Sequence, residues 1–416
     1  MKFAVIMAAA VMLSASPALG QERPALDPKS LEAALATNPQ GSEAERLADR
    51  IRQAFGGRDA LLRGAQPMID ELTVAWAIDL PGWHPAPNLP SPRVWRPVGN
   101  AGYPMTQIGT TGVYALVRTF AHGDAFPWTY DAGGNWRLGS GTIEVYQTHP
   151  DARVRAGVPK GTLTQMPQWH SKVFLGTTRD WWVYIPAQYR PETPAAVMVF
   201  QDGNVARQYV VPVFDNLIAQ GGMPVTVGIF IEPGGITSPR DNRSFEYDTL
   251  SDQYARFLLE EILPDVEKSV TLRRDAAGRA IAGQSSGAIA AFTVAWERPK
   301  EFSKVLSGIG SFTNIAAGDS LREGGHNYAA LIRRVPRKPI RIFMQDGAND
   351  LDVMAGSWWL ANLTLARSLA YAGYDYMFVT GQGFHNNNHM RAILPDALRW
   401  LWRDEADRMQ VTSTTR

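Results

Sequence analysis

A serine bracketed by two glycines is the residue pattern with the clearest chemical meaning. Gly283-Gln284-Ser285-Ser286-Gly287 has the form G-x-S-x-G, which in hydrolases presents a serine at a sharp turn between a strand and a helix. The apolar residues 280–282 precede it, and the small and apolar residues 288–296 follow it. Glycine at both flanks avoids collisions with neighbouring backbone. We therefore predict that Ser285 is a nucleophile; the alternative is an ordinary Gly/Ser turn.

A serine hydroxyl needs a base, and the base needs an acid to orient it. One acidic loop, 345–352, follows the predicted strand 340–344 and contains three aspartates. Asp350 lies a few residues beyond the strand, with room to turn back towards a histidine, so we favour it as the acid. Asp346 and Asp352 remain alternatives. A calcium site is disfavoured because no ladder of ligands continues at the required spacing.

A histidine loop follows the next predicted strand, 376–379. His385 lies in this loop, and His389 lies about one turn further along in a helix. We predict His385 as the base. His389 is the alternative base, or the two could bind a metal at i,i+4 spacing, but no glutamate adjoins the first histidine as in zinc proteases. We expect no metal and no cofactor, and we assign His326 to a loop or the substrate pocket.

The negative oxygen that forms in acyl transfer needs two backbone N–H donors. One is expected from Ser286, directly after the nucleophile. The other is expected from the loop after the predicted strand 197–200, where Gly203 allows close approach of the backbone. Either Gly203 or Asn204 can supply this donor.

Composition limits the function classes. The chain has 416 residues, of which 45% are hydrophobic and 19% charged, as in ordinary globular proteins. A formal charge of +1 argues against a dedicated nucleic-acid binder. The 13 tryptophans suit thick cores or surfaces that stack on carbohydrate. The absence of cysteine excludes disulfides, thiol nucleophiles and thiolate metal sites.

The amino terminus has the form of a secretory signal. Lys2 precedes the apolar run 3–13, and Ala18-Leu19-Gly20 provides a small-x-small cleavage site. We predict a signal peptide at 1–20 and an exported protein, periplasmic or extracellular. No other segment approaches the roughly 20 apolar residues of a membrane span.

The remaining chain divides into four predicted segments: a helical segment 21–67, a β-rich module 68–157, a domain of alternating strands and helices 158–406, and a polar tail 407–416. The β-rich module resembles a small immunoglobulin-like β-sandwich; it is either a carbohydrate-gripping module or a structural spacer. Strand–helix alternation predicts an α/β fold of three layers around a mostly parallel sheet.

From about 158 to 404 the chain resembles the enterochelin-esterase-like "putative esterase" family, which includes the feruloyl and acetylxylan esterases of carbohydrate esterase family 1. The resemblance rests on the stretches 200–203, 260–264, 282–287, 347–350 and 383–385. It implies the α/β-hydrolase fold, a Ser285–Asp350–His385 triad and hydrolysis of carboxylic esters without a cofactor.

Further residues are candidates for substrate contact. Arg243 and Glu246 look like the family's R-x-x-E motif, and the alternative for them is a structural Arg–Glu pair at the rim. The other candidates for substrate contact are Trp358, His326 and His389.

We therefore expect an exported serine esterase that works through an acyl-enzyme. Its tryptophan content and exported location favour a carbohydrate-linked ester of the feruloyl or acetyl xylan type. The alternatives are a siderophore trilactone esterase, a sugar acyltransferase, and a glycan-binding protein without catalytic activity.

Overall fold

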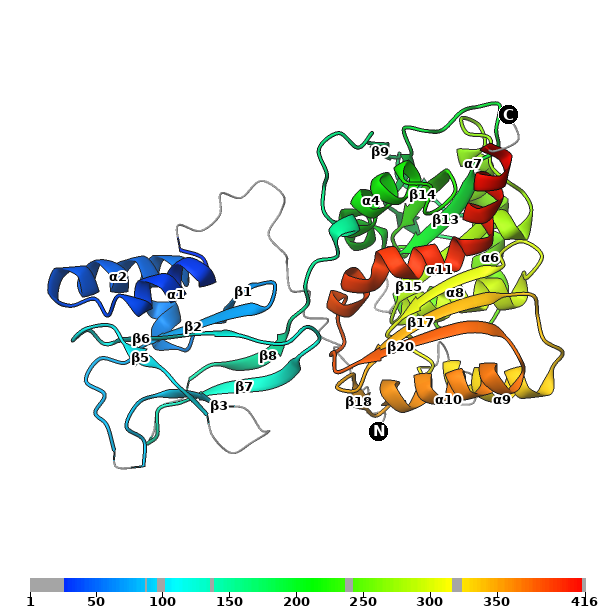
Figure 1. Cartoon of the computed structure of the whole chain (residues 1–416). Helices are drawn as coiled ribbons and strands as arrows, with labels where there is room; N and C mark the ends of the chain where they lie inside the picture. The colour runs from blue at the N-terminus through cyan, green and yellow to red at the C-terminus, as the bar shows by residue number, and fades with distance from the viewer. Residues whose placement is uncertain are drawn as a thin grey trace. The chain divides into compact units, whose positions relative to one another are not determined.

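The computed structural model describes residues 26–86, 88–95, 102–134, 138–235, 242–315 and 324–413. It divides into two compact units (Figure 1). The first comprises residues up to His122 together with Phe126–Val145, and the second comprises Gly123–Ala125 and everything from Tyr146 onward. This division falls earlier than the predicted start of the catalytic domain at 158. The predicted signal peptide lies outside the described residues.

The first unit combines two four-stranded sheets with three helices. The helices are α1 (Pro28–Ala36), α2 (Gly41–Ala54) and α3 (Arg58–Leu62). One sheet has the order β1-β2-β6-β5 and consists of β1 (Met68–Asp70), β2 (Thr73–Asp79), β6 (Val113–Thr119) and β5 (Thr106–Gln107). The other has the order β4-β3-β7-β8 and consists of β4 (Tyr103–Pro104), β3 (Arg93–Trp95), β7 (Ala125–Asp131) and β8 (Ser140–Glu144).

Strand β2 explains why this unit has two cores. All of its residues are buried, and successive side chains of a strand point to opposite faces. Trp76 and Ile78 pack into a cluster with side chains of the second sheet, whereas Ala75 and Ala77 pack into a cluster with the helices. Small residues face the helices and large ones face the other sheet. The predicted β-sandwich-like module is confirmed, and the preceding helices pack onto it.

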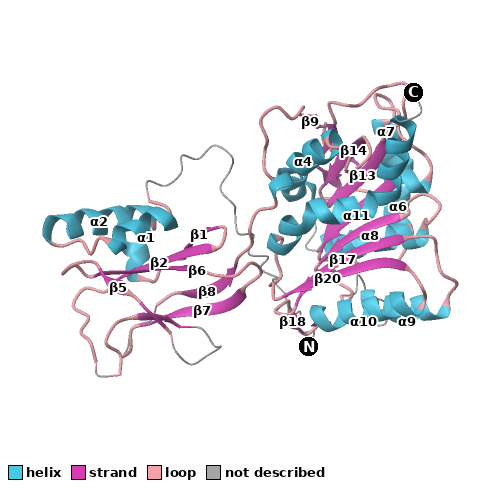
Figure 2. Cartoon of the chain, viewed as in Figure 1, coloured by secondary structure: helices cyan, strands magenta, loops and turns pink. Residues whose placement is uncertain are grey.

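The second unit is built on an eight-stranded sheet with the order β20-β17-β16-β15-β13-β14-β12-β9 (Figure 2). Six strands are parallel: β13 (Ala196–Gln201), β14 (Thr226–Ile231), β15 (Arg279–Gln284), β16 (Lys304–Gly308), β17 (Arg341–Gly347) and β20 (Asp375–Gly381). At one edge, β12 (Trp181–Ile185) pairs antiparallel with β14, and β9 (Thr162–Gln165) pairs antiparallel with β12. The mostly parallel sheet predicted from strand–helix alternation is confirmed.

Helices cover both faces of this sheet. One face carries α4 (Gly203–Ala219) and α11 (Asn388–Ser413). The other carries α5 (Asn242–Tyr247), α6 (Gln253–Phe257), a π-helical turn (Leu258–Ile262), α7 (Leu263–Val266), α8 (Ser286–Glu297), α9 (Tyr328–Arg334) and α10 (Trp358–Tyr371). The three predicted layers are therefore present. Helix α11 continues to Ser413 and so includes most of the predicted polar tail 407–416.

Short elements complete the second unit: β10 (Trp169–His170) paired with β11 (Thr178–Arg179), β18 (Asp352–Val353) paired with β19 (Gly356–Ser357), and the 3₁₀ turns Pro150–Ala152, Ala276–Gly278 and Gly325–Asn327. Among the helices that the structure describes, none combines the length and the apolar character needed to span a bilayer.

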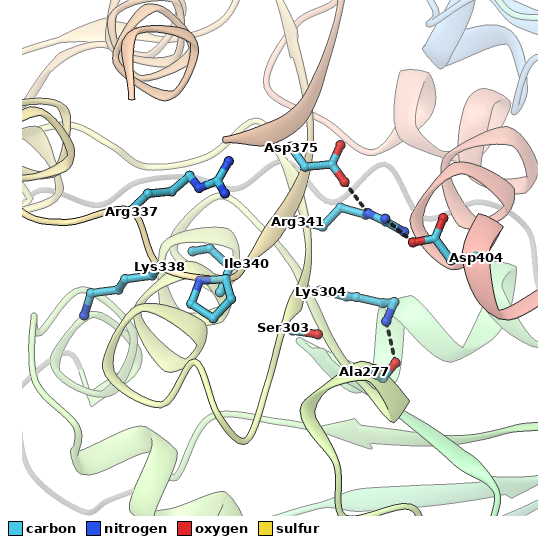
Figure 3. A pocket seen from close by; sticks show the side chains of 10 residues that line it. Ala277, Ser303, Lys304, Arg337, Lys338, Ile340, Arg341, Asp375 and Asp404 are labelled. Carbon is cyan, nitrogen blue, oxygen red and sulfur yellow. Dashed lines mark hydrogen bonds and ion pairs between the residues drawn. The ribbon is translucent and has the colours of Figure 1, made fainter. Parts of the chain in front are cut away.

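The amino ends and the carboxyl ends of the parallel strands form two different surfaces of the sheet. A cavity of about 300 Å³ lies where β16, β17 and β20 begin (Figure 3). Arg341 binds both acidic residues of its lining, Asp375 and Asp404. Lys304, Arg337 and Lys338 also line it and leave an excess of positive charge there. Parallel strands place their carboxyl ends together at the opposite edge, and that is where Ser285 follows β15. Ligands of α/β sheets bind at that carboxyl edge.

Candidate active site

Ser285 occupies the turn between β15 and α8, as predicted. Its backbone angles are φ 56° and ψ −125°, a positive φ that non-glycine residues seldom adopt. A Cβ atom on Gly283 would lie 2.1 Å from the carbonyl oxygen of Gly287, and one on Gly287 would lie 2.9 Å from the Cβ of Gln201. Only glycine fits at both positions, so the motif holds Ser285 in a strained turn at the carboxyl edge of the sheet.

The serine, histidine and one aspartate form a continuous hydrogen-bonded chain. The Oγ atom of Ser285 lies 2.9 Å from Nε2 of His385. Nδ1 of the same imidazole lies 2.6 Å from Oδ1 of Asp350, which also accepts the N–H of Leu351 at 2.5 Å. Each residue follows a different parallel strand: β15, β17 or β20. The arrangement can activate a serine hydroxyl by general-base catalysis.

The two other aspartates of the acidic loop lie elsewhere. Asp352 is exposed in β18. Asp346 is fully buried; its carboxyl group accepts the N–H of Gly347 at 2.7 Å and forms a side-chain hydrogen bond with Asp350. Burial, together with the negative charge and hydrogen bond of Asp350, raises the pKa of Asp346 to about 9. At neutral pH, therefore, the acid of the chain is accompanied by a second, protonated carboxyl group.

Electrostatics keep His385 neutral at physiological pH. Burial lowers its pKa to about 4, and the guanidinium of Arg243 reinforces this shift; only an ionised Asp346 would oppose it. A neutral imidazole can accept a proton from Ser285, whereas a protonated one cannot.

The expected oxyanion donors lie at the starts of two helices. Ser286 is the first residue of α8 and Gly203 is the first residue of α4, so their N–H groups have no acceptor within the helix. The N–H of Asn204 donates to Glu232 at 2.6 Å and is therefore already used. A Cβ atom on Gly203 would lie 2.3 Å from the backbone N of Ile231, so glycine allows α4 to start against β14.

Arg243 and Glu246 do not pair with each other, which corrects the predicted rim pair. Arg243 makes a bidentate ion pair with Asp202, at 2.9 and 2.8 Å. Burial alone would lower the pKa of Arg243, but the charge and hydrogen bonds of Asp202 raise it. Asp202 has a left-handed backbone, with φ 50°, and directly precedes Gly203. Arg243 therefore anchors the loop that carries one expected oxyanion donor.

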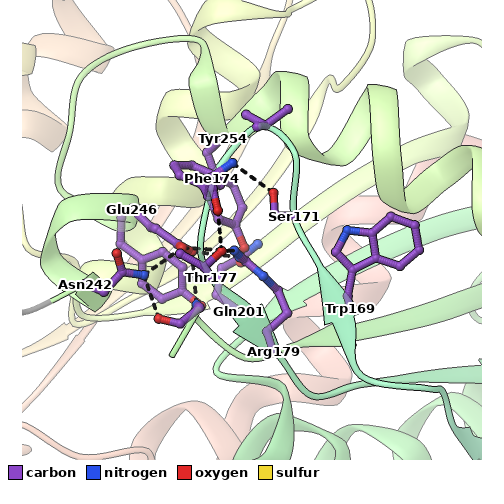
Figure 4. Close-up of polar contacts among 12 residues, drawn as sticks. Trp169, Ser171, Phe174, Thr177, Arg179, Gln201, Asn242, Glu246 and Tyr254 are labelled. Atoms are coloured by element: carbon purple, nitrogen blue, oxygen red, sulfur yellow. Dashed lines mark hydrogen bonds and ion pairs between the residues drawn. The ribbon is translucent and has the colours of Figure 1, made fainter. Parts of the chain in front are cut away.

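Glu246 belongs to a buried polar network (Figure 4). Its carboxylate binds the guanidinium of Arg179 at 2.7 and 3.0 Å, and both side chains are completely buried. It also accepts the side-chain amide of Asn242 at 2.7 Å. Beside it, the hydroxyl of Tyr254 donates to the side chain of Gln201 at 2.5 Å. Because Glu246 is enclosed, it is not available to a substrate.

The three remaining candidates differ in exposure. His326 is exposed, and its backbone N–H donates to the carbonyl of Thr313 at 3.1 Å. His389 is buried between Gln345, whose amide nitrogen lies 3.1 Å from its Nδ1, and Tyr146, on which its ring stacks. Over the ranges that the structure describes, no group of three His, Asp or Glu side chains is arranged to hold a metal ion.

Trp358 is buried behind the imidazole. Its ring meets the ring of His385 edge-on, with 5.7 Å between centroids, and its Nε1–H donates to the hydroxyl of Ser311 at 3.1 Å. Ser311 was not predicted from the sequence, although its Oγ lies 3.2 Å from that of Ser285. The available signal was weak: a serine that follows a buried strand next to β15.

Comparison with known proteins agrees with this architecture. A family model described as "Putative esterase" matches residues 173–401. The enterobactin esterase of Shigella flexneri, solved in the presence of enterobactin, is 17% identical with a TM-score of 0.56, over 82% of this chain and 96% of that one. The ferric enterobactin esterase of Salmonella typhimurium is 18% identical with a TM-score of 0.55, over 80% and 94%.

A ferulic acid esterase of Anaeromyces mucronatus is also similar. It is 18% identical, with a TM-score of 0.49, over 61% of this chain and 96% of that one. No curated protein sequence matches this chain.

Proposed function

The chain belongs to the "Putative esterase" family, and from this premise we propose that it is a serine esterase whose nucleophile is Ser285. The observation that carries the proposal is the unbroken hydrogen-bonded chain from Ser285 through His385 to Asp350, at 2.9 and 2.6 Å. In hydrolases with this fold the same chain order, serine then acid then histidine, is used for acyl transfer.

The proposed reaction has two halves. In acylation, Nε2 of His385 takes the proton of Ser285 while Oγ attacks the ester carbonyl; the alcohol leaves with that proton. In deacylation, His385 takes a proton from water, and the resulting hydroxide attacks the acyl carbonyl. The bond between the acyl carbon and Oγ then breaks, its electron pair returns to Oγ, and His385 gives the proton back to Oγ. Asp350 orients His385 and stabilises its charged form.

Two backbone donors hold the negative oxygen in each half. We assign this role to the N–H groups of Ser286 and Gly203. Gly203 is preferred over Asn204 because the N–H of Asn204 donates to Glu232. Each such donor stabilises the transition state more than the ground state, because the oxygen carries its full charge only there.

Substitution of the nucleophile tests the proposal. Ser285→Ala should lower kcat for p-nitrophenyl acetate by more than about 10⁴-fold and abolish labelling by a fluorophosphonate. Ser303→Ala, at the amino edge of the sheet, is the matched control and should retain both properties. Activity that survives in a folded Ser285→Ala protein would disprove the assignment.

The grounds for a glycan substrate are weaker than the sequence suggested. Every tryptophan in the described parts of the chain is buried or partly buried, so none of these presents a fully exposed ring on which a sugar could stack. A catecholate trilactone is the second candidate, because the likeness to enterobactin esterases spans 82% of this chain. A panel of methyl ferulate, acetylated xylan and a catecholate trilactone separates the two, with kcat/KM as the readout.

Export is part of the proposal and rests on the sequence of residues 1–20 alone. Fractionation of cells that express the full chain, followed by sequencing of the mature amino terminus, tests it. A protein that keeps Met1 and stays with the cytoplasmic fraction would contradict export without affecting the esterase assignment.

A further inference from the structure

The proposed nucleophile has a second hydrogen-bonding partner besides the histidine. Oγ of Ser311 lies 3.2 Å from Oγ of Ser285, and Ser311 is completely buried. The same Ser311 oxygen accepts the indole N–H of Trp358 at 3.1 Å. Five groups therefore form one chain, from Trp358 through Ser311, Ser285 and His385 to Asp350.

Donor and acceptor chemistry fixes the direction of this chain. An indole N–H can only donate, and a hydroxyl has a single proton. Ser311 accepts from Trp358, so its own proton is available to Ser285. The proton of Ser285 points to Nε2 of His385, because Nδ1 carries the proton donated to Asp350. Every hydrogen bond then runs the same way, from the indole to the carboxylate.

A strained turn holds Ser311 in place. Ser311 follows β16 through Gly308-Ile309-Gly310, in which Ile309 has φ 42°. Left-handed backbone at a β-branched residue is rare and strained, so the surrounding contacts must impose it.

Hydrogen bonds from three elements impose that turn. The N–H of Ile309 donates to Gln345 at 2.7 Å, and the N–H of Ser311 donates to the carbonyl of Ser285 at 3.2 Å. The side chain of Asn362 donates to Gly310 at 2.9 Å. The strained turn at Ile309 thus places the hydroxyl of Ser311 next to that of Ser285.

We propose that Ser311 is a further catalytic residue, which donates a hydrogen bond to Oγ of Ser285, and that Trp358 is a positioning residue that fixes the direction of this bond. The proposal rests on the proposed role of Ser285 as nucleophile. It replaces the predicted role of Trp358 in substrate contact.

The bond would act in both halves of the reaction. Oγ of Ser285 has four tetrahedral directions: its Cβ, the proton given to His385, the hydrogen bond from Ser311, and one lone pair. Because the first three directions are fixed, the lone pair points at the ester carbonyl. The hydrogen bond from Ser311 thus orients the attacking atom. In deacylation the electron pair of the C–O bond returns to Oγ, and the hydrogen bond strengthens as negative charge builds there.

Removal of the hydroxyl is the first test. Ser311→Ala should lower kcat for p-nitrophenyl acetate and the rate of fluorophosphonate labelling by about 10- to 100-fold, less than the loss of a direct oxyanion donor, with KM changed by less than about twofold. Ser311→Thr keeps the hydroxyl and should recover most of the loss. Ser307→Ala, which removes an equally buried hydroxyl from β16, is the matched control and should match the wild type.

A double-mutant cycle tests the role of Trp358. Trp358→Phe keeps an aromatic ring beside His385 but removes the indole N–H, so it should lower kcat without raising KM. In Ser311→Ala the indole N–H of Trp358 no longer has a hydroxyl to bind. The kcat of the double variant should therefore lie within about twofold of that of Ser311→Ala. Effects that multiply would show that Trp358 acts independently, and would overturn its assigned role.

The two proposals fail in different ways. If Ser285→Ala keeps activity, the proposed nucleophile is wrong. If Ser285 is labelled but Ser311→Ala reacts as fast as the wild type, only the role of Ser311 is wrong. Should Ser311→Ala not fold, the labelling rate of Trp358→Phe decides: a fall at unchanged Tm supports the chain, and a wild-type rate overturns it.

Discussion

The pKa of His385 determines over which pH range the candidate base can accept a proton. Burial and the guanidinium of Arg243 lower this pKa, to about 4. A histidine with a lowered pKa stays neutral to a lower pH than usual. We therefore expect kcat/KM for p-nitrophenyl acetate to remain on its plateau as the pH falls through 6.5, and to halve only near about 4.

The measurement is a pH–rate profile at constant ionic strength, with circular dichroism to show that the protein stays folded. A midpoint near 6.5 would mean that the imidazole is not held neutral by its surroundings.

Asp346 links the active site to stability. Its pKa in the folded protein is raised from 3.8 to about 9, so between these values the unfolded chain has lost a proton that the folded chain keeps. Stability then falls as pH rises through that window. Asp346→Asn removes the titration and can still donate to Asp350, so it should raise Tm by about 5 °C at pH 8, and by less at pH 5.

Thermal unfolding at several pH values measures this difference. Asp352→Asn, in the exposed β18, is the control and should leave Tm unchanged. If the gain for Asp346→Asn does not grow with pH, Asp346 is not the group that titrates.

At the scale of residues, the sequence was informative where chain order and chemistry coincide. Ser285, Asp350 and His385 follow successive predicted strands in the order that the chemistry needs, so their proximity could be predicted. Ser311 could not, because its position depends on left-handed backbone at Ile309, which the propensity of isoleucine opposes. The partner of Glu246 was also missed: Arg179 lies 67 positions away in the sequence, and no local pattern pairs them.

At the scale of elements, a buried ion pair joins β11 to α5. Removing one member of such a pair leaves a buried charge uncompensated, which costs about 3–5 kcal/mol. Glu246→Gln should therefore lower the free energy of unfolding by about 3 kcal/mol or more, because Arg179 stays charged and enclosed.

Urea denaturation measures the free energy of unfolding. Glu260→Gln is the matched control: Glu260 forms an exposed pair with Arg256 one helical turn away and should unfold as the wild type does. A Glu246→Gln protein of wild-type stability would show that the buried charge is compensated in another way.

Periodicity explains which elements could be predicted. The parallel strands are short apolar runs between turns, and they were found because strands buried on both faces carry no polar alternation. The helical stretch 253–266 is divided into α6, a π-helical turn and α7. Pro264, which lacks a backbone N–H, lies just after that turn, and local widening of this kind leaves little trace in hydrophobic spacing.

At the scale of the whole molecule, all the groups assigned to the reaction lie in the second unit. That unit has its own core on both faces of its sheet. We expect a fragment that begins at Tyr146 to fold alone and to hydrolyse p-nitrophenyl acetate with a kcat within about threefold of the full chain.

Gel filtration and circular dichroism of the purified fragment establish folding, and its kinetics with small and large esters test the first unit. A folded fragment that turns over the small ester but has a raised KM for the large one would assign substrate binding to the first unit. An inactive but folded fragment would contradict the location of the complete site in the second.

The fold class followed from strand–helix alternation, but the order of strands in the sheet did not. Sequence places β13 to β20 in succession, whereas β15 lies beside β13 and β14 lies on the far side of β13. Such crossovers are decided by contacts between distant segments. The helices at 28–62 were predicted, but not that they cover one face of the adjoining sheet, because the small residues Ala75 and Ala77 of β2 create that surface.

The placement of the site along the sheet also affects how the enzyme would lose activity. Ser285 follows β15, which has neighbours on both sides, while His385 follows β20, which pairs only with β17 among the described strands and is half-exposed along its length. Edges open at lower free energy than centres. We therefore expect moderate heat or denaturant to displace the candidate base before the proposed nucleophile, so that activity is lost reversibly below the Tm; an activity that falls only together with the circular dichroism signal would contradict this.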